Sequence, residues 1–258
     1  MSKKIGLALS GGGARGFAHI GVLKALVQHQ IPIDMIAGVS AGAIVGGAFA
    51  SGMPINEIAA MASKIGWTNM MRPSLSPLGL LSSAPMGKFL KQHLPVSRFE
   101  DLAVPFAAVT CDFDSGEEVV LVGSGDLAFA IRASCAVPGL FAPLTDAAGR
   151  LLVDGGVVSP VPTDAVRQMG ADIVIAVDLI ASGVTFRTRP RTAIGMIFQS
   201  AMASLRAASR NQHYHADLVI VPKIAHLRPD EIKKRDEFIS LGKAEACEKL
   251  DEIRSAVE

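Results

Sequence analysis

The stretch Met35-Ile36-Ala37-Gly38-Val39-Ser40-Ala41-Gly42-Ala43-Ile44 decides the fold, because an apolar run meets a serine between two glycines and continues in small residues. A chain that passes from a strand into a helix through one sharp turn brings the residues two before and two after the serine too close for side chains. Gly38 and Gly42 stand at these positions. The first N–H groups of the helix stay free beside the serine and carry partial positive charge. The pattern therefore predicts an exposed nucleophile at Ser40.

Two other interpretations of this stretch involve no catalysis. The four glycines between 38 and 47 also permit close packing of a helix. No charged residue occurs between Asp34 and Glu57, as in a membrane span. The stretch is mostly Gly, Ala and Ser, however, and a glycine, a proline and an asparagine between 52 and 56 interrupt it. We therefore expect a buried core helix rather than a span.

The overall composition limits the class of protein. The 258 residues are half hydrophobic and contain no linker-like segment, so we expect one domain over residues 1–258. Lys and Arg total 25 against 24 for Asp and Glu, and the net charge of +1 predicts no binding of nucleic acid. A single Trp and a single Tyr leave no aromatic surface for base stacking. Any membrane contact is expected to be local and apolar.

Cysteine usage and the first residues bear on the compartment. Cys111, Cys135 and Cys247 are widely spaced, without the pattern of a zinc site or a disulfide scaffold, so we expect reduced thiols and no bound metal. The apolar run Ile5–Leu9 is too short for the core of a signal peptide. The sequence thus predicts a cytoplasmic protein, with peripheral contact at the inner membrane surface as an open alternative.

A second glycine-rich loop precedes the serine. Ile5–Leu9 predicts a buried strand, and the loop Ser10–Gly16 opens a helix before the next strand, Met35–Val39. A strand, helix and strand of this length form a βαβ unit with parallel strands. If the strands are neighbours, the loop lies beside Ser40. Its bare N–H groups, at Gly12 and Gly13, would then form an oxyanion hole together with the N–H of Ala41.

The same loop also matches a dinucleotide-binding pattern. Gly11, Gly13 and Gly16 satisfy G-x-G-x-x-G after a strand, and Asp34 lies near the distance expected of a ribose-binding acid. A dinucleotide site requires that acid at the end of the second strand, whereas Asp34 precedes the strand and Ser40 ends it. An oxidoreductase with a dinucleotide cofactor remains an alternative function.

Candidates for a base follow later in the chain. The apolar residues Leu151–Val153 predict a strand that delivers Asp154-Gly155-Gly156, and the two glycines let the carboxylate approach another loop closely. Asp178, at the end of the predicted strand Ile173–Val177, is a reserve candidate. A desolvated carboxylate gains basicity and could activate Ser40 directly. A rival triad would add His213 or His215, in the order Ser, Asp, His.

Other segments complete the expected organisation. Trp67–Phe89 shows no clean period and is expected to be a mobile cap over an apolar pocket, a lipid-touching patch or an irregular packed crossing. Ser124 is expected to cap a helix that ends at Cys135. Three arginines between 187 and 191 are expected to be solvated. The remaining predicted elements are a hairpin of Phe106–Cys111 with Val119–Val122, a helix from Thr163, a helix over Thr192–Arg210, a strand at Leu218–Val221 and an amphipathic helix over Phe238–Val257.

Four blocks in this order resemble the patatin-like phospholipase family: Gly11–Gly16, Gly38–Gly42, Ala133–Pro143 and Asp154–Gly156. The resemblance covers roughly residues 5–180, followed by a strand and helices over about 190–258. It implies an α/β fold with a mixed, mainly parallel central sheet flanked by helices on both faces. It also implies serine acyl hydrolysis without a cofactor, with a catalytic pair and a glycine-loop oxyanion hole. The residues so implied are Ser40 and Asp154 for catalysis, Gly11, Gly12, Gly13 and Ala41 for the oxyanion hole, and Arg15, Gly16, Gly38, Gly42, Gly155 and Gly156 as motif support.

The resemblance implies phospholipids, lysophospholipids or other long-chain acyl esters as substrates. A non-catalytic lipid-binding or regulatory protein on the same scaffold is a further alternative. A labelling experiment distinguishes it from the hydrolase, because the non-catalytic protein is expected to show no covalent reaction of Ser40 with a fluorophosphonate.

Overall fold

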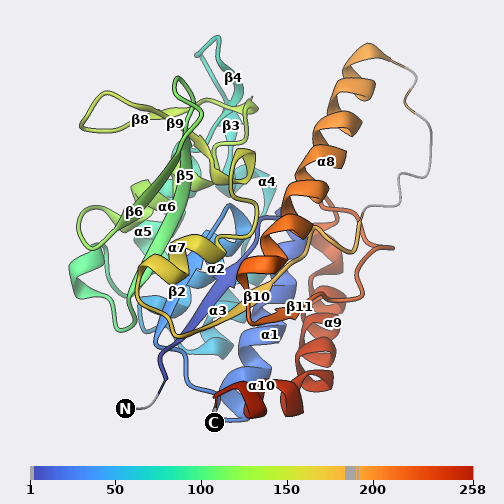
Figure 1. Ribbon diagram of the computed structural model, residues 1–258. Coiled ribbons are helices and arrows are strands. Elements are labelled where there is room, and N and C mark those ends of the chain that lie inside the picture. Colours follow the sequence, from blue (N-terminus) through green and yellow to red (C-terminus); the bar gives the residue numbers. More distant parts are fainter. Residues whose placement is uncertain (1–2, 184–189, 191, 258) are drawn as a thin grey trace.

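The computed structural model describes residues 3–183, 190 and 192–257, and the arginines between 187 and 191 lie outside this part. A sheet crosses the centre of the molecule (Figure 1). Its strands, in spatial order, are β11 (Leu218–Ile220), β10 (Ile173–Val177), β1 (Ile5–Leu9), β2 (Met35–Gly38), β5 (Phe106–Asp112), β9 (Leu151–Asp154) and β8 (Leu144–Thr145), with β6 (Glu118–Val122) also paired to β5.

The central sheet is mixed and mainly parallel, as predicted. β11, β10, β1, β2 and β5 form successive parallel pairs. The pairing of β1 with β2 confirms the βαβ unit expected from the sequence. β6 and β9 pair antiparallel with β5, and β8 pairs antiparallel with β9. The hairpin of β5 and β6 is therefore also confirmed.

Helices cover both faces of the sheet. Their bounds are α1 (Phe17–Gln28), α2 (Ala41–Ala50), α3 (Ile55–Ser63), α4 (Trp67–Met70), α5 (Ala84–His93), α6 (Leu127–Ser134), α7 (Thr163–Gln168), α8 (Ala193–Gln212), α9 (Arg235–Glu248) and α10 (Leu250–Val257). Short 3₁₀ turns are η1 (Gly13–Gly16), η2 (Phe99–Asp101), η3 (Gly155–Val157), η4 (His213–His215) and η5 (Ile232–Lys234). Within the described ranges, no helix combines the length and the apolar character needed to cross a bilayer.

The core divides according to the alternation of side chains along the strands. Leu7 and Leu9 of β1 belong to the large apolar cluster that includes α1, α2 and α9. Ala8, which points to the other face, belongs to a second cluster with Val166 of α7. This alternation explains why the strands consist of continuous apolar runs, since both faces of a parallel sheet are buried.

A second, three-stranded sheet extends beyond the central sheet. It consists of β3 (Arg72–Pro73), β4 (Gly79–Ser82) and β7 (Gly139–Phe141), with β3 and β4 antiparallel and β4 and β7 parallel. In Figure 1 this small sheet lies at the upper end of the molecule, and the first turns of α8 reach the same end. Of the three alternatives for Trp67–Phe89, the irregular crossing is wrong in part, because the segment contains α4, this hairpin and the start of α5. The mobile cap and the lipid-touching patch stay predictions.

Two sequence predictions need correction. Asp126, not Ser124, caps α6: its Oδ1 accepts the N–H of Phe129 at 2.9 Å. A carboxylate at this position satisfies a free helix amide and interacts favourably with the helix dipole. The expected single helix over Phe238–Val257 is two helices, α9 and α10, and both contribute to the large apolar cluster through Phe238 and Ile253.

Candidate active site

Two strands approach each other end to end along one edge of β5. β2 pairs with the first part of β5 and ends where Gly38 lies opposite Ala108. β9 runs in the opposite direction, pairs with the last part of β5 and ends where Asp154 lies opposite Thr110. β6 occupies the other edge of β5, so β2 and β9 share this one. The arrangement brings Ser40, two residues beyond the end of β2, to Asp154.

Ser40 has a strained backbone conformation at the turn from β2 into α2. Its φ is 53° and its ψ is −120°, a region that side-chain-bearing residues rarely adopt. Such strain costs about 1–3 kcal/mol and persists where the surrounding structure enforces it. A Cβ at Gly38 would lie 2.6 Å from the carbonyl oxygen of Gly42, and a Cβ at Gly42 would lie 2.2 Å from that of Leu9. The close approach predicted at these two glycines is present.

Ser134, the last residue of α6, holds this turn. Its hydroxyl accepts the N–H of Ser40 at 2.9 Å and donates to the carbonyl of Val109 at 2.7 Å. Ser134 is fully buried, so both bonds are shielded from water. The local sequence does not indicate this role, because Ser134 bonds to residues that are 94 and 25 positions away in the chain. The available signal was the position of Ser134 at the end of an apolar helix, where the serine caps no other helix.

Asp154 is buried and only partly hydrogen-bonded. Its side chain is 6% exposed, and Oδ1 accepts the N–H of Gly156 at 2.8 Å. Within the described part of the chain, Oδ2 has no hydrogen bond of good geometry. Burial raises the pKa of Asp154 to about 6, although the nearby Ser40 hydroxyl and the Gly156 N–H oppose the rise. Asp154 is therefore ionised at pH 7 and more basic than an exposed carboxylate.

The glycine loop packs against Ser40. A Cβ at Gly11 would lie 3.4 Å from the Cβ of Ser40. The N–H of Gly11 donates to the carbonyl of Pro160 at 3.2 Å, so it is already used. Among the hydrogen bonds of the described residues, none engages the N–H groups of Gly12, Gly13 or Ala41. These three amides are thus the better candidates for an oxyanion hole, and Gly11 supplies close approach instead of a donor.

Arg15 anchors the glycine loop from within the protein. The side chain is 2% exposed and donates to the carbonyls of Leu179 and Leu227. Burial lowers its pKa to about 10, with a contribution from Arg206, so it stays charged at neutral pH. Its hydrogen bonds tie the loop to two distant segments of the chain. Arg15 is therefore a structural support, not a group that faces a substrate.

The other motif glycines each mark a close contact. A Cβ at Gly16 would lie 2.4 Å from that of Ala41, so Gly16 lets η1 touch the start of α2. A Cβ at Gly155 would lie 2.3 Å from the carbonyl oxygen of Val109. A Cβ at Gly156 would lie 3.0 Å from Oδ1 of Asp154. These contacts explain why bare backbone follows Asp154.

Cys135 lies beside the candidate pair, which the sequence did not predict. Its thiol is buried, and the pKa is raised well above the ordinary value by burial and by the charge of Asp154, although the Ser40 hydroxyl opposes the rise. The thiolate is the nucleophilic form of cysteine. A thiol that stays protonated is disfavoured as the nucleophile of this site.

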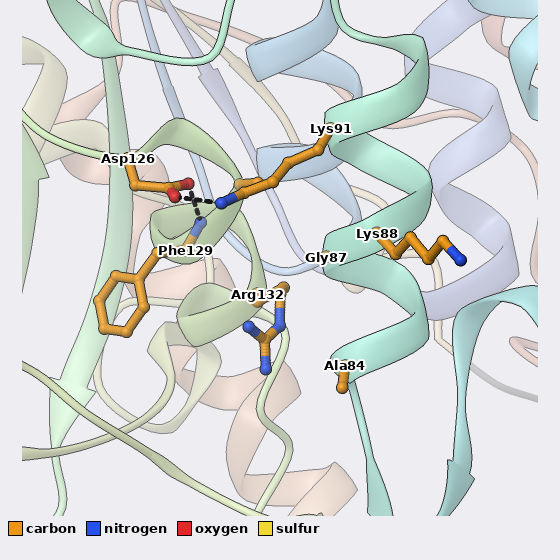
Figure 2. Close-up of a pocket in the computed structure, with 8 residues that line it drawn as sticks. Ala84, Gly87, Lys88, Lys91, Asp126, Phe129 and Arg132 are labelled. Atoms are coloured by element: carbon orange, nitrogen blue, oxygen red, sulfur yellow. Dashed lines mark hydrogen bonds and ion pairs between the residues drawn. The ribbon is translucent and has the colours of Figure 1, made fainter.

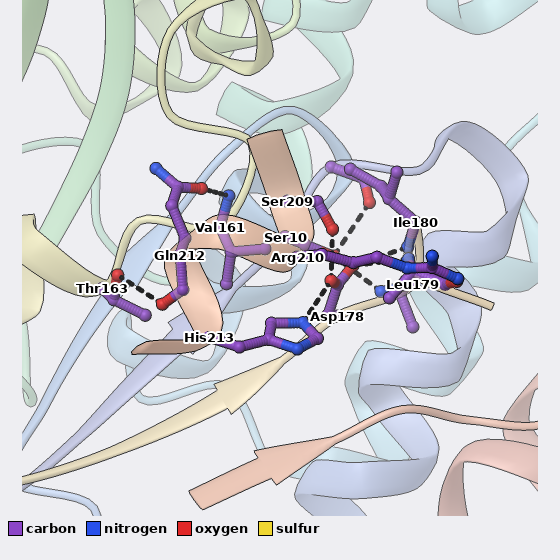
Figure 3. Close-up of polar contacts among 12 residues, drawn as sticks. Ser10, Val161, Thr163, Asp178, Leu179, Ile180, Ser209, Arg210, Gln212 and His213 are labelled. Carbon is purple, nitrogen blue, oxygen red and sulfur yellow. Dashed lines mark hydrogen bonds and ion pairs between the residues drawn. The ribbon is translucent and has the colours of Figure 1, made fainter. Parts of the chain in front are cut away.

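Asp178, the reserve candidate for the base, lies in a separate polar cluster (Figure 3). Its Oδ1 accepts the N–H groups of Ile180 and Ala181 at 2.7 and 3.0 Å. Its Oδ2 accepts from the hydroxyl of Ser209 and pairs with Nε2 of His213 at 2.7 Å. Burial alone raises the pKa of Asp178, but these donors outweigh it and hold the pKa below its ordinary value. Asp178 is saturated with donors and fixes the end of α8 instead of facing Ser40.

The residues of the two rival sites lie elsewhere. His215 Nδ1 contacts Oδ1 of Asp164 at 2.6 Å on the surface. Within the described structure, no hydrogen bond joins His213 or His215 to Ser40. Asp34 accepts the N–H of Ile5 at 2.7 Å, at the start of β1, whereas the glycine loop follows the end of β1. The carboxylate of Asp34 is therefore at the wrong end of the sheet to bind a ribose.

A cavity of about 260 Å³ lies between α5 and α6 (Figure 2). An ion pair of 2.6 Å between Lys91 and Asp126 crosses one end of it. Neither Ser40 nor Asp154 lines this cavity, so it is separate from the candidate site. Its lining residues are Ala84, Gly87, Lys88, Lys91, Asp126, Ala128, Phe129 and Arg132.

The fold recurs in solved structures. VipD from Legionella pneumophila has a TM-score of 0.66 and 16% identity, over 98% of this chain and 67% of VipD. ExoU of Pseudomonas aeruginosa, solved with SpcU, has a TM-score of 0.55 and 15% identity, over 98% of this chain and 53% of the other. At such identities the likeness concerns the fold alone.

Sequence comparison gives the family. An uncharacterized NTE family protein of Mycobacterium tuberculosis is 40% identical over 184 residues, 70% of this chain and 50% of that protein. The patatin-like phospholipase domain-containing protein 7 of Mus musculus is 36% identical over 182 residues, 68% of this chain and 13% of the mouse protein. The match thus spans half or less of these relatives. The family model described as patatin-like phospholipase matches residues 7–167. The chain therefore belongs to the patatin-like phospholipase family.

Proposed function

We propose that the chain is a serine hydrolase of lipid acyl esters that works through an acyl-enzyme on Ser40, with Asp154 as the base. The observation that carries the proposal is that a strained serine meets a buried carboxylate, whose pKa the Ser40 hydroxyl lowers as a hydrogen-bonding neighbour. Family membership supports a lipid ester as the substrate, and phospholipids, lysophospholipids and other long-chain acyl esters fit this class.

The first half of the reaction forms the acyl-enzyme. Oγ of Ser40 attacks the carbonyl carbon of the ester while its proton passes to the carboxylate of Asp154. The carbonyl oxygen becomes negative and accepts hydrogen bonds from the N–H groups of Gly12, Gly13 and Ala41. Asp154 then gives its proton to the leaving alcohol as the ester bond breaks. The acyl chain remains bound to Ser40 as an ester.

Water completes the cycle by the same steps. Asp154 takes a proton from a water molecule, which attacks the acyl carbon, and the bond to Ser40 breaks with return of a proton to its oxygen. The products are a free fatty acid and the restored serine. General base catalysis contributes about 10²–10⁴ in rate, and each oxyanion donor lowers the barrier by about 3 kcal/mol.

Histidine substitutions separate this pair from a triad. Because His213 pairs with Asp178 and His215 with Asp164, we expect His213→Ala and His215→Ala to keep hydrolysis of a long-chain ester within about threefold of the wild type. Release of free fatty acid from mixed micelles measures the rate, and circular dichroism checks the fold. A folded His213→Ala or His215→Ala protein that has lost hydrolysis would replace the pair with a triad.

The burial of Asp154 predicts a gain of stability on its removal. Its pKa rises from 3.8 to about 6 on folding, so the folded state binds more protons and stability falls as pH rises between these values. Above pH 6 the carboxylate of Asp154 is ionised in the folded state, and its burial lowers the free energy of unfolding by the full amount. Asp154→Asn is therefore expected to raise the free energy of unfolding at pH 7.5 by on the order of 2 kcal/mol, with a smaller gain at pH 5. Urea denaturation at both pH values measures it.

Asp126→Asn is the matched control for this stability prediction. The pKa of Asp126 is lowered because the hydrogen bonds from Lys91 and Phe129 outweigh burial, so its ionised form stabilises the fold at pH 7.5. We expect this variant to lose stability at that pH. An Asp154→Asn protein that is no more stable than the wild type at pH 7.5 would show that the Asp154 carboxylate is well solvated.

Two other functions make different predictions. A dinucleotide-dependent oxidoreductase predicts saturable binding of NAD(P), and a calorimetric titration tests it; the position of Asp34 disfavours this function. A non-catalytic lipid-binding protein predicts lipid binding without release of fatty acid and without labelling of Ser40.

A further inference from the structure

Two hydrogen bonds hold the peptide unit between Val39 and Ser40. Its N–H, which belongs to Ser40, donates to the hydroxyl of Ser134 at 2.9 Å. Its carbonyl, which belongs to Val39, accepts the N–H of Gly42 at 2.8 Å. The second bond stays within the turn, whereas the first comes from another helix, α6. Ser134 therefore fixes the plane of this peptide from outside the turn.

The orientation of this peptide unit sets the strain at Ser40. A peptide unit is planar and rotates as a whole, so its rotation changes the φ of the residue that follows it. The plane between Val39 and Ser40 thus decides whether Ser40 keeps its φ of 53°. Release of the plane would let φ return to the negative values that serine prefers, and would turn this N–H away from Ser134. The bond to Ser134 opposes that relaxation.

The strained turn also keeps the hydroxyl of Ser40 off the helix that follows. Ser40 stands at the N-cap of α2, where a serine side chain ordinarily accepts an N–H of the first turn. Among the described residues, its Oγ makes no such capping bond. The hydroxyl lies instead beside Asp154, where it opposes the rise in the pKa of that carboxyl. The conformation of the turn therefore directs Oγ at the candidate base.

The second bond of Ser134 reaches the gap between the two strands that carry the site. On this edge of β5, β2 ends opposite Ala108 and β9 ends opposite Thr110. Val109 lies between these positions, and its carbonyl accepts the Ser134 hydroxyl at 2.7 Å. A Cβ at Gly155 would lie 2.3 Å from the same carbonyl oxygen, so the turn that follows β9 also packs against it. One hydroxyl thus ties the turn of Ser40 to the point on which the other turn rests.

The same end of α6 also holds the candidate base. The carbonyl of Ala136, two residues after Ser134, accepts the N–H of Asp154 at 2.9 Å. Ser134 and Ala136 are fully buried. In a close-packed interior, neighbouring groups have little freedom to shift independently. The placement of Ser40 relative to Asp154 therefore depends on the last residues of α6.

We propose that Ser134 is a positioning residue for ester hydrolysis, whose hydroxyl holds the peptide unit between Val39 and Ser40 in the orientation that directs Oγ of Ser40 at Asp154. The inference rests on the proposed function. Ser134 acts through the backbone of Ser40 and takes no part in the transfer of the proton. Its loss would leave Asp154 in place and let Ser40 relax away from it.

The first test compares Ser134→Ala with the wild type in release of free fatty acid from mixed micelles. Because the substitution displaces the nucleophile and leaves the surface of the protein unchanged, we expect kcat to fall about 10–100-fold while KM stays within about threefold. The rate of labelling with a fluorophosphonate is expected to fall by the same factor. The midpoint of urea unfolding is also expected to fall, since two buried groups lose their shared partner.

The pH profile distinguishes positioning from a general loosening of the fold. The Ser40 hydroxyl opposes the rise in the pKa of Asp154, which burial brings to about 6. A displaced Ser40 no longer opposes it, so the midpoint of kcat/KM against pH is expected to lie higher in Ser134→Ala than in the wild type. Cys135, a titratable neighbour of Asp154, stays neutral in this range because burial raises its pKa.

Ser51→Ala is the matched control, because Ser51 is also a buried serine at the end of a helix, and its hydroxyl donates to the carbonyl of Ala48 at 2.7 Å. It is expected to keep the kcat, KM and midpoint of the wild type. Ser134→Thr retains a hydroxyl and is expected to recover kcat to within about tenfold of the wild type, with the wild-type midpoint. Ser134→Cys keeps a weaker donor and acceptor, is expected to lie between the other two variants, and decides the question if Ser134→Ala does not fold.

Two results would overturn the proposal. The first is a folded Ser134→Ala protein with the kcat of the wild type. The second is a fall in kcat with an unchanged midpoint, which would assign the loss to general loosening.

Hydrogen exchange at the N–H of Ser40 separates this proposal from the proposed function, because it needs no hydrolysis. We expect this N–H to exchange at least about tenfold faster in Ser134→Ala than in Ser51→Ala. A wild-type protein that releases no fatty acid, while Ser134 still protects the N–H, would refute the hydrolase and leave the hold of Ser134 on the peptide intact. Hydrolysis that requires Ser40 and Asp154 but not the Ser134 hydroxyl would do the reverse.

Discussion

Ser40→Ala is expected to abolish hydrolysis of a long-chain acyl ester, with a fall in kcat of about 10³-fold or more. The substitution removes the atom proposed to form the acyl-enzyme and changes little else, because alanine meets the same backbone strain at a φ of 53° as serine does. The residual rate is measured by release of free fatty acid. The free energy of unfolding is expected to stay within about 0.5 kcal/mol of the wild type.

Ser63→Ala serves as the control for this prediction, since Ser63 is an exposed serine at the end of α3 and bonds only to the local carbonyl of Ala60 within the described structure. Its activity is expected to equal that of the wild type. A folded Ser40→Ala protein that hydrolyses the ester at a tenth of the wild-type rate or better would place the nucleophile elsewhere.

Asp154→Asn is expected to lower kcat by about 10²–10⁴-fold, because asparagine cannot accept the proton of Ser40. The wild-type enzyme is expected to gain activity with rising pH as Asp154 ionises. Since burial raises the pKa of Asp154 to about 6, kcat/KM should rise about tenfold per unit below pH 6 and level off above it. The measurement is a pH profile of ester hydrolysis from pH 4.5 to 8.5.

The outcome at low pH distinguishes the carboxylate from a histidine triad. Asp154 as base predicts that the rising limb of the profile disappears in Asp154→Asn. If this folded variant keeps the rising limb at a comparable rate, another group accepts the proton. The same substitution is expected to stabilise the protein at pH 7.5, so loss of activity through unfolding is not expected.

The order of the motifs predicts much of the fold. The apolar runs Ile5–Leu9 and Met35–Val39 predicted two parallel strands, because a strand, helix and strand of this length form a βαβ unit, and the structure shows that the two strands are also neighbours. The close contacts at Gly38 and Gly42 followed from the same steric argument. Asp154 was placed at the end of a strand, and β9 ends there.

Other features of the site depend on contacts between distant residues. β9 and β2 pair with the same edge of β5. This arrangement depends on pairing between strands that are far apart in the sequence, and no local pattern encodes it. The bonds of Ser134 to Ser40 and Val109 join three elements, so local sequence could not indicate them. The use of the Gly11 amide by Pro160 likewise appears only when the chain folds.

The two remaining wrong predictions concern the cap of α6 and the helix expected over Phe238–Val257. Ser124 and Asp126 are both able to cap α6, and the sequence alone does not decide between them, whereas the fold selects the carboxylate two residues later. The helical period of Phe238–Val257 continues through Lys249, but the chain bends there so that Ile253 joins the core.

The features that would support the proposed catalysis oppose stability. Ser40 is held at a φ that costs energy, and Asp154 is ionised without full solvation. Both costs fall on one small region, where Ser134 and Arg15 supply buried hydrogen bonds. Strain and desolvation at a single point of a well-packed fold favour a reactive site over a purely structural one.

Labelling with a long-chain fluorophosphonate, followed by peptide mapping, tests whether Asp154 activates Ser40, because this reagent bonds only to an activated nucleophile. Asp154→Asn is labelled in parallel, with the Ser63→Ala protein as control. We expect one adduct, on the peptide that carries Ser40, formed at the control rate in Ser63→Ala and at a rate reduced by about 10²-fold or more in Asp154→Asn. An unlabelled Ser40, or equal labelling of the Asp154→Asn protein, would contradict it.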